Sequence, residues 1–409
     1  MIKAVLLDLD DTLLRIDTDA FVERYLRTLT QLILERYPAL AESPVPVGKA
    51  IMRAVRDLIT NLDPTRSNAE VFTDAISTML EVPTEALFEV FAEFYKTGYA
   101  AMADAAAQIE AAQPLLERLT GLGLAVVIAT NPLFPLEATQ QRLDWAGLGS
   151  HTFSLITHIG EMHFAKPMPH YYEEILARVG VEADEAIMIG DNFENDILPA
   201  AKAGINTFWI DLGKSLLADL SPESTPDGQG TLAEFEQLVT QEWLATLKPR
   251  AHTPEQVVPR MLGNIGALFG LISSIKPEYW NMRPDPQEWS PLETICHLRD
   301  SERMIQRPRL QRIAREDNPF ISDTKPPPGP GERNLSREDG NMALRELWDE
   351  RCQTINFIRG LQPDDWKRPA RHSIFGPTTL LEMAHFSTRH DHLHINQLCE
   401  TIGRCRKTV

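Results

Sequence analysis

Three polar side chains follow short apolar runs in the first part of the chain. Asp8 follows AVLL, Thr130 ends AVVIAT, and Asp191 follows AIMIG. Continuous runs rich in Val, Ile and Leu are typical of strands buried on both faces of a parallel sheet. Because ligands bind at the carboxyl ends of such strands, we expect these side chains to gather there. The sequence therefore predicts a polar site with two carboxylates and a hydroxyl at one edge of a sheet.

A second group of chemically capable residues lies near the end of the chain. His390 and His394 are four residues apart, so on a helix they project from one face, about 40° apart, and could bind one ion. His385 and His392 point roughly the opposite way. His297, on an earlier predicted helix, is the natural third ligand. Three ligands leave a position for water or substrate, as in a reactive metal site rather than a closed structural one.

The elements that position the first group form a doubly wound α/β domain. The runs AVLL, AVVI, FSLITH, AIMIG and NTFWI predict strands, and helical patterns at about 133–146, 168–180 and 194–203 supply the crossovers of a parallel sheet. About 115 residues separate the first two strands, far more than a crossover needs. Their apolar positions recur at helical spacing, which predicts an inserted helical cap that closes over a small substrate.

Composition changes near residue 250. Residues 1–250 hold 18 Lys+Arg and 37 Asp+Glu, a net charge of −19, whereas the remainder holds 22 and 21, or +1. All four cysteines and seven of the eleven histidines lie beyond this point. We place a domain boundary there. The predicted organisation is a domain at 1–245, with its core at 1–14 and 109–245 and its cap at about 15–108, then a linker at 246–254 and a second domain at 255–409.

The second domain is predicted to be an all-α four-helix bundle. Helical patterns occur at about 255–275, 291–316, 337–360 and 378–402, and no convincing strand pattern accompanies them. The fold class is therefore α/β, a doubly wound parallel sheet with an inserted helical cap, followed by the bundle. A helix face of the bundle is a candidate surface for a homodimer.

Composition also excludes several classes of partner. The net charge of −18 argues against nucleic acid, whose phosphates are bound by clustered Lys and Arg. No apolar run reaches the roughly 18 residues that span a bilayer, and carboxylates interrupt the first segment before a signal-peptide core could form. We therefore expect no membrane partner and a cytoplasmic location. The four cysteines give no disulfide framework.

Four short motifs in the first domain carry a family resemblance. DLDDTL at 8–13, ATN at 129–131, KP at 166–167 and GDNFEND at 190–196 look like the ordered motifs of the haloacid dehalogenase-like hydrolase superfamily, over roughly residues 1–245. Each motif alone is weak, and the specificity lies in all four occurring in order at the expected structural places.

The resemblance implies phosphoryl transfer by the first aspartates of the chain. Asp8 would be the nucleophile and form an aspartyl-phosphate. Asp10 would protonate the leaving oxygen as a general acid and later activate water as a general base. Asp8 and Asp191, with the backbone carbonyl of Asp10, would hold Mg²⁺, a hard cation that prefers oxygen ligands.

The remaining motif residues would surround the phosphoryl group. Thr130 and Lys166 would bind its oxygens, and Asp196 would support the metal ion or orient Lys166. The superfamily also includes dehalogenases and phosphomutases. Asp10 favours phosphoryl chemistry, because a departing halide needs no acid to protonate it. The expected activity is a magnesium-dependent phosphatase acting on a small phosphorylated metabolite.

The second domain resembles the DinB/YfiT-like family of four-helix metal-binding proteins. The similar stretches are EWSPLETICHL at 288–298, DDWKRPARHSIFGPTTLLEMAHF at 364–386 and HDHLHINQL at 390–398. The resemblance implies a divalent metal, most often zinc or nickel, on the ligands His297, His390 and His394. Glu293, one turn before His297, is either an acceptor for that ring or a first-turn charge.

The resemblance leaves the role of the bundle open. Some relatives look like thiol-dependent transferases or isomerases, so an alternative makes the bundle the active unit and the first domain inactive or regulatory. In a third interpretation the bundle only senses or dimerises and carries no reaction.

Overall fold

In the computed structural model the chain forms two compact units, Met1–Arg250 and Ala251–Val409. The structure describes residues 1–213, 215, 220–221, 224–322, 329, 331–332, 334–335 and 337–408. No helix in these ranges is long and apolar enough to cross a membrane.

The first unit is built on a six-stranded parallel sheet whose strand order is β5-β4-β1-β6-β7-β8. The five apolar runs singled out in the sequence all form strands, and most of their residues are buried. The sixth strand is formed by the short polar segment GQG and was not predicted. The strands are β1 (Ala4–Leu7), β4 (Ala125–Ile128), β5 (Leu155–Ile156), β6 (Ala186–Gly190), β7 (Asn206–Ile210) and β8 (Gly228–Gly230).

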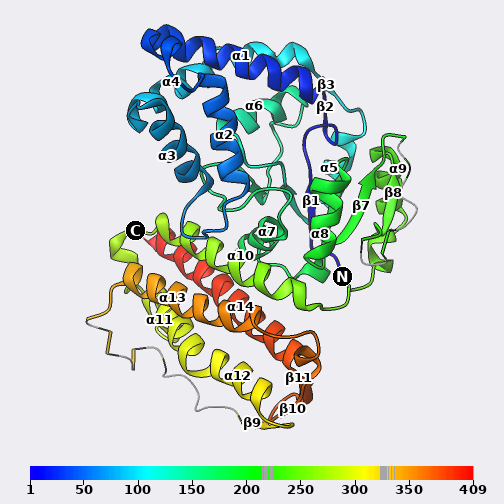
Figure 1. The fold of residues 1–409 in the computed structure, drawn as a ribbon. Helices are drawn as coiled ribbons and strands as arrows, with labels where there is room; N and C mark the ends of the chain where they lie inside the picture. The colour runs from blue at the N-terminus through cyan, green and yellow to red at the C-terminus, as the bar shows by residue number, and fades with distance from the viewer. Residues whose placement is uncertain are drawn as a thin grey trace. The chain divides into compact units, whose positions relative to one another are not determined.

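Helices connect these strands and cover the sheet (Figure 1). Side chains such as Leu7 and Ile189 pack in one apolar core with Leu115 and Phe235, which come from the helices α5 and α9. The prediction of an α/β fold with helical crossovers is confirmed. The elements are α5 (Ala112–Gly121), α6 (Leu136–Trp145), α7 (Pro169–Val179), the π-helical turn η4 (Phe193–Ile197), α8 (Leu198–Lys202) and α9 (Leu232–Thr240).

Most of the long segment between β1 and β4, up to β3, is a helical insert with its own apolar core. Phe21, Leu29, Ile33 and Phe94 are buried in that core. The two ends of the insert pair as an antiparallel ribbon of β2 (Leu14–Ile16) and β3 (Ala106–Gln108), which the sequence did not predict. The helices are α1 (Thr18–Arg36), η1 (Pro38–Glu42), α2 (Val47–Ile59), α3 (Asn68–Leu80), α4 (Thr84–Lys96) and η2 (Ala100–Ala105).

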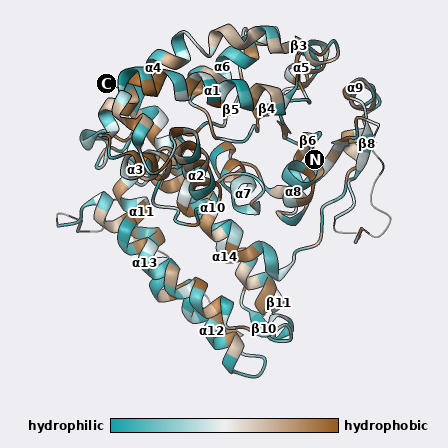
Figure 2. Cartoon of the chain, turned by 45° about the horizontal axis from the view of Figure 1, so that its top comes forward, coloured by the Kyte–Doolittle hydropathy of each residue, from teal (hydrophilic) through white to brown (hydrophobic). Residues whose placement is uncertain are grey.

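The second unit is mainly four long helical segments that lie alongside one another (Figure 1). The first and last segments pack together, as do the second and third. Hydrophilic and hydrophobic residues are interspersed along each segment (Figure 2), as expected for helices with one buried and one solvated face. The elements are α10 (Pro254–Ser273), α11 (Pro291–Ser301) continued by the π-helical turn η7 (Glu302–Gln306) and α12 (Arg307–Arg315), α13 (Gly340–Arg359) and α14 (Leu380–Thr408).

A small sheet accompanies the bundle, so the expectation that this unit has no strands is wrong. The strands β9 (Phe320–Ile321), β10 (Pro369–His372) and β11 (Gly376–Thr379) lie in the order β11-β10-β9. Exposed and buried residues alternate along β10. Each strand has four residues or fewer, and β10 and β11 each contain a proline, a residue that argues against a strand in sequence. These features hide the alternation.

Candidate active site and candidate metal centre

The three strand-end residues lie at one edge of the sheet because their strands are neighbours. Leu7 of β1 is paired with Ile128 of β4 on one side and with Ile189 of β6 on the other. Asp8 follows β1 at once, and the other two side chains follow β4 and β6 within two residues. Because β1 lies between β4 and β6 and the three strands end level with one another, Asp8, Thr130 and Asp191 lie at the same place. At this place the strand order reverses, which is where open α/β sheets bind ligands.

A cluster of three carboxylates forms at this edge. One oxygen each from Asp8, Asp191 and Asp196 lies within 4.8 Å of the others, and the side chain of Asp196 is only 1% exposed. Carboxylates at such spacing repel one another in a low-dielectric setting. A hard divalent cation with oxygen ligands would relieve that repulsion, so the donor set fits the expected magnesium ion. The carboxyl group of Asp10 is not part of this cluster, and the role of its backbone carbonyl as a ligand stays a prediction.

Lys166 is a buried cation between two of these carboxylates. Its Nζ lies 2.6 Å from Asp8 Oδ1 and 2.6 Å from Asp196 Oδ1. Burial alone would lower the pKa of Lys166, but the carboxylates of Asp196 and Asp8 outweigh it and hold that pKa well above its usual value. Lys166 therefore stays charged, which is the state needed to bind phosphoryl oxygens.

The loop after β6 is shaped to return Asp196 to the site. The side chain of Asn192 caps the turn η4 by accepting hydrogen bonds from the backbone N–H of Glu194 (3.2 Å) and Asn195 (3.0 Å). Asp196 Oδ2 accepts from the backbone N–H of Asn192 at 3.1 Å. A Cβ on Gly190 would lie 2.3 Å from that same Oδ2, so only glycine permits the approach. The motif GDNFEND thus encodes the shape of a loop as well as the two carboxylates, of Asp191 and Asp196, that join the cluster.

Two tyrosines of α7, which the sequence analysis missed, fasten the loops that carry the site. Tyr171 Oη donates to the carbonyl oxygen of Thr130 at 2.8 Å. Tyr172 Oη donates to the carbonyl oxygen of Asn195 at 2.7 Å. Both rings are fully buried. The sequence did contain a signal for these contacts, namely two adjacent tyrosines early in the helix after the Lys-Pro motif. A buried Tyr hydroxyl usually has a hydrogen-bond partner.

Asp10 has a partner that the sequence analysis also missed. Arg142 Nη1 donates to Asp10 Oδ2 at 2.5 Å. Arg142 lies on α6, 132 residues further along the chain, and its side chain is 1% exposed. A single arginine within the pattern of α6 gave no indication of this pairing.

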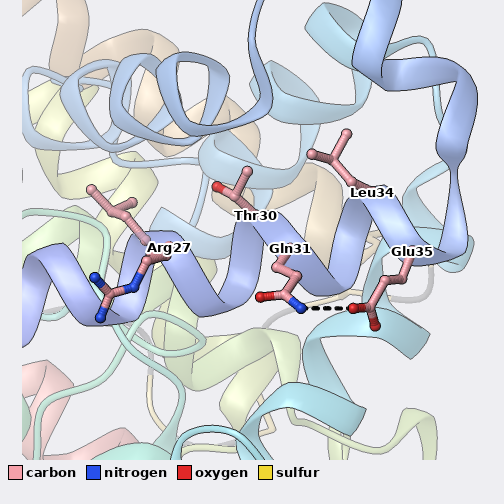
Figure 3. Close-up of a pocket in the computed structure, with 6 residues that line it drawn as sticks. Arg27, Thr30, Gln31, Leu34 and Glu35 are labelled. Carbon is pink, nitrogen blue, oxygen red and sulfur yellow. Dashed lines mark hydrogen bonds between the residues drawn. The ribbon is translucent and has the colours of Figure 1, made fainter.

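The surface of the insert carries a separate hollow, which contains none of the residues above. It has a volume of about 500 Å³ and lies along α1 (Figure 3). Two of its lining residues are hydrogen-bonded, since Gln31 donates to Glu35 at 2.9 Å. Its lining residues are Leu26, Arg27, Thr30, Gln31, Leu34 and Glu35.

In the second unit three histidines converge from two helices. His297 comes from α11, and His390 and His394 come from α14. One ring nitrogen of each lies within 4.8 Å of the others, and the Nε2 atoms of His297 and His390 are 3.3 Å apart. Zinc–nitrogen bonds of about 2.0–2.1 Å place two ligands of a tetrahedral ion roughly 3.3 Å apart. The spacing therefore fits two nitrogens that share one ion.

The surroundings of His394 favour its metal-binding form. Its Nδ1 is 3.0 Å from Gln397 Oε1, an acceptor that leaves the lone pair on Nε2. Burial, together with the neighbouring His390, lowers the pKa of His394 to about 4. The ring of Trp289 stacks on that of His394 with centroids 5.5 Å apart. His394 is thus a neutral, oriented imidazole at neutral pH.

Glu293 is not an acceptor for His297. Its two oxygens accept from Arg283 at 2.8 and 2.9 Å, and one of them also accepts from the backbone N–H of Ser290 at 2.8 Å. Ser290 in turn caps the first turn of α11. Of the two interpretations left open by the sequence, the structure supports the second, in which Glu293 is a charged residue of the first turn of α11.

A buried ionic network lies beside the histidines and was not predicted. Arg351 Nη2 is 2.8 Å from Asp391 Oδ2 and 3.0 Å from Glu302 Oε2. All three residues are buried. Asp391 follows the candidate ligand His390, and Glu302 begins the π-helical turn η7. Such turns occur often at functional sites, and this one delivers a carboxylate into the bundle core.

Family comparisons agree with the two units. Residues 2–204 match the model of the haloacid dehalogenase-like hydrolase family, and residues 264–398 match that of the DinB superfamily. The first part of the chain thus resembles haloacid dehalogenase-like hydrolases and the second resembles the DinB superfamily, as the motifs predicted.

Curated relatives and solved structures resemble the first unit. The phosphoserine phosphatase of Thermus thermophilus is 36% identical over 116 residues, which are 28% of this chain and 44% of that protein. The acid sugar phosphatase of Staphylococcus aureus is 26% identical over 102 residues, 25% of this chain and 39% of that protein. The chain thus spans less than half the length of these relatives.

One similar solved structure is a 2-haloacid dehalogenase from Pseudomonas syringae pv. tomato DC3000, which is 23% identical to this chain. The match covers 59% of this chain and 100% of that chain, with a TM-score of 0.43. A HAD phosphatase from Thermococcus onnurineus has 19% identity, covers 58% of this chain and 98% of that chain, and has a TM-score of 0.38.

Proposed function

We propose that the first unit is a magnesium-dependent phosphatase of a small phosphorylated metabolite and works through an aspartyl-phosphate on Asp8. The observation that carries the proposal is the convergence of Asp8, Asp191 and Asp196 around the buried ammonium of Lys166. The family match and the two phosphatase relatives support it.

The side chains divide the reaction between them. Lys166 holds Asp8 Oδ1 and so fixes the orientation of the carboxylate that attacks phosphorus. As the bond from phosphorus to the leaving oxygen breaks, Asp10 gives that oxygen a proton. Asp10 then takes a proton from water, whose oxygen attacks the phosphorus, and phosphate leaves with Asp8 regenerated. Mg²⁺, when bound by Asp8 and Asp191, would neutralise charge on the phosphoryl oxygens.

Dehalogenation is the competing reaction for this site, and Asp10 argues against it. Halide leaves as a stable anion, whereas an alkoxide needs a proton as it leaves. An acid placed two residues after the nucleophile is therefore useful for a phosphate ester and of no use for a haloacid.

Hydrolysis assays test the proposal. We expect the purified chain to hydrolyse p-nitrophenyl phosphate with Mg²⁺, to stop with EDTA, and to lose at least about 10³-fold in kcat as Asp8→Asn. Asp74→Asn, a change of the same kind at a surface salt bridge, should behave as wild type. Release of chloride from 2-chloropropionate by the wild type, with no phosphate released from p-nitrophenyl phosphate or a panel of phosphorylated metabolites, would contradict the assignment.

For the second unit we propose a divalent transition metal, zinc or nickel, on His297, His390 and His394. The 3.3 Å separation of two imidazole nitrogens supports it. The alternative in which the bundle performs metal-assisted thiol transfer or isomerisation, with the first unit inactive or regulatory, requires this metal.

Metal analysis of the full chain tests the centre. Equilibrated with Zn²⁺ or Ni²⁺ and then dialysed, the Asp8→Asn chain should retain about one ion, and the added pair His390→Ala and His394→Ala should remove it. His151→Ala, a histidine of the first unit, is the matched control. Unchanged metal content in the double histidine variant would refute the ligand assignment.

A further inference from the structure

The buried arginine behind Asp10 has no place in the mechanism so far. Arg142 Nη1 bonds Asp10 Oδ2 at 2.5 Å, and its Nη2 lies 3.5 Å from Thr139 Oγ1. The ring of Phe134 lies under the guanidinium, 4.8 Å from its central carbon. Thr139 of α6 and Phe134 of the loop before it thus contact Arg142, which in turn bonds the carboxylate of Asp10.

Burial decides between two roles for this arginine. The side chain of Arg142 is 1% exposed, whereas that of Asp10 is 30% exposed. A residue that recognises an anionic part of the substrate must be reachable, and Arg142 is not. Asp10, which Arg142 contacts directly, is the more exposed of the two, so we expect the effect of Arg142 on the reaction to pass through Asp10.

Arg142 is also the main constraint on the orientation of Asp10. In the described part of the chain, Asp10 Oδ1 is buried without a hydrogen-bond partner. The other buried cation of the site, Lys166, bonds Asp8 and Asp196 instead. Asp8 and Asp10 therefore bond different cations, and without Arg142 the Asp10 carboxylate would lose the one hydrogen bond that the described residues give it.

We propose that Arg142 is a positioning residue that aims the carboxyl group of Asp10 at the leaving oxygen of the substrate. The inference rests on the proposed phosphatase function, in which Asp10 gives its proton to that oxygen while the bond to phosphorus breaks. Positioned acids and bases contribute about 10²–10⁴-fold to rate, and misdirection forfeits part of that contribution.

The inference predicts a dependence on the leaving group. p-Nitrophenolate leaves as a stable anion and needs no proton, whereas the alkoxide from glycerol 2-phosphate does. The value of kcat/KM depends only on the steps up to and including the first irreversible one. It therefore reports departure of the leaving group and not the later attack of water. In Arg142→Met we expect kcat/KM to fall roughly 30–100-fold for glycerol 2-phosphate and no more than about 3-fold for p-nitrophenyl phosphate.

A double-mutant comparison tests whether the effect passes through Asp10. In an Asp10→Asn background, Arg142→Met should cause no further loss on glycerol 2-phosphate. Arg142→Lys, which keeps the charge, should recover part of the wild-type rate. Arg118→Met removes an arginine from a surface salt bridge with Glu236 and serves as the control, with no change on either ester.

Two results would overturn the inference: an equal loss on both esters in Arg142→Met, or a further loss on top of Asp10→Asn. If Arg142→Met alone does not fold, the comparison of Asp10→Asn with Asp10→Asn/Arg142→Met still decides, since the double variant carries neither charge of the pair. A different result would contradict the proposed function itself: hydrolysis by the wild type that persists in Asp8→Asn.

Discussion

Replacing Gly190 by alanine perturbs the proposed active site without removing any reacting group. The new Cβ would lie 2.3 Å from Asp196 Oδ2 and 2.6 Å from its Cβ. Ordinary contact begins at about 3.4 Å, so the Asp196 carboxylate must move by roughly 1 Å. Its hydrogen bond to Lys166, 2.6 Å long, would break, and the third corner of the carboxylate cluster would leave its place.

The expected cost is larger in activity than in stability. A misplacement of about 1 Å can reduce turnover roughly 10²-fold, whereas overpacking typically lowers the free energy of unfolding by about 1–3 kcal/mol. We therefore expect kcat/KM for p-nitrophenyl phosphate to fall 30–300-fold, with a weaker response to added Mg²⁺, in a protein that still folds at 25 °C. The assays are phosphate release across a Mg²⁺ titration and thermal denaturation.

Gly121→Ala is the matched control, because nothing lies within 4 Å of the Cβ it would gain. That variant should keep wild-type activity. If Gly190→Ala retains wild-type kcat/KM and the same half-saturating Mg²⁺ concentration, the position of Asp196 is unimportant and the reasoning is refuted.

Three further predictions concern buried ionisable groups. Lys166→Met should lower kcat/KM by at least about 10²-fold, without rescue by excess Mg²⁺, because it leaves two buried carboxylates unpaired. Burial and His252 lower the pKa of His385 to about 4, so the unfolded chain binds a proton that the folded one excludes. Stability should therefore fall as pH drops from about 6.5 to 4, by up to about 3 kcal/mol, in denaturant titrations. Glu293→Gln should lower the free energy of unfolding at pH 7 by about 1–3 kcal/mol, since Arg283 loses its ion pair.

Each of these predictions has its own control and contrary outcome. For Lys166, Lys202→Met removes an exposed lysine and should leave kcat/KM unchanged; equal losses in both would contradict the assignment. For His385, the variant His385→Gln should flatten the stability profile between pH 4 and 6.5, and an unchanged slope would show that other groups cause it. For Glu293, the double change with Arg283→Met should cost less than the single one; additive losses would indicate no coupling.

The residues that the sequence placed together are those fixed by local pattern. Asp8 and Asp191 end strands that are apolar throughout, and parallel strands in one sheet leave little choice about where such ends meet. His390 and His394 share a helix face because of the helical repeat alone. In both cases a short stretch of sequence contains the whole geometric argument.

The residues that were missed are paired across long separations. Arg142 meets Asp10 across 132 residues, and Arg351 meets Glu302 across 49. No periodicity records such a pairing, because it depends on how helices pack after they have formed. The π-helical turn that begins at Glu302 has the same origin, since its residues suit an ordinary α-helix equally well. Homodimer formation through the bundle stays a prediction, and size-exclusion chromatography with light scattering would check it.

The ribbon of β2 and β3 bears on how such a chain could change its substrate during evolution. The insert leaves and re-enters the sheet domain through this one pair of strands, which join residues 14–16 to 106–108. Recombination at these two neighbouring points would exchange the whole helical module for another and leave Asp8, Lys166 and the loop that carries Asp191 and Asp196 intact. The proposed catalytic residues and the insert that we expect to select the substrate can thus be inherited separately.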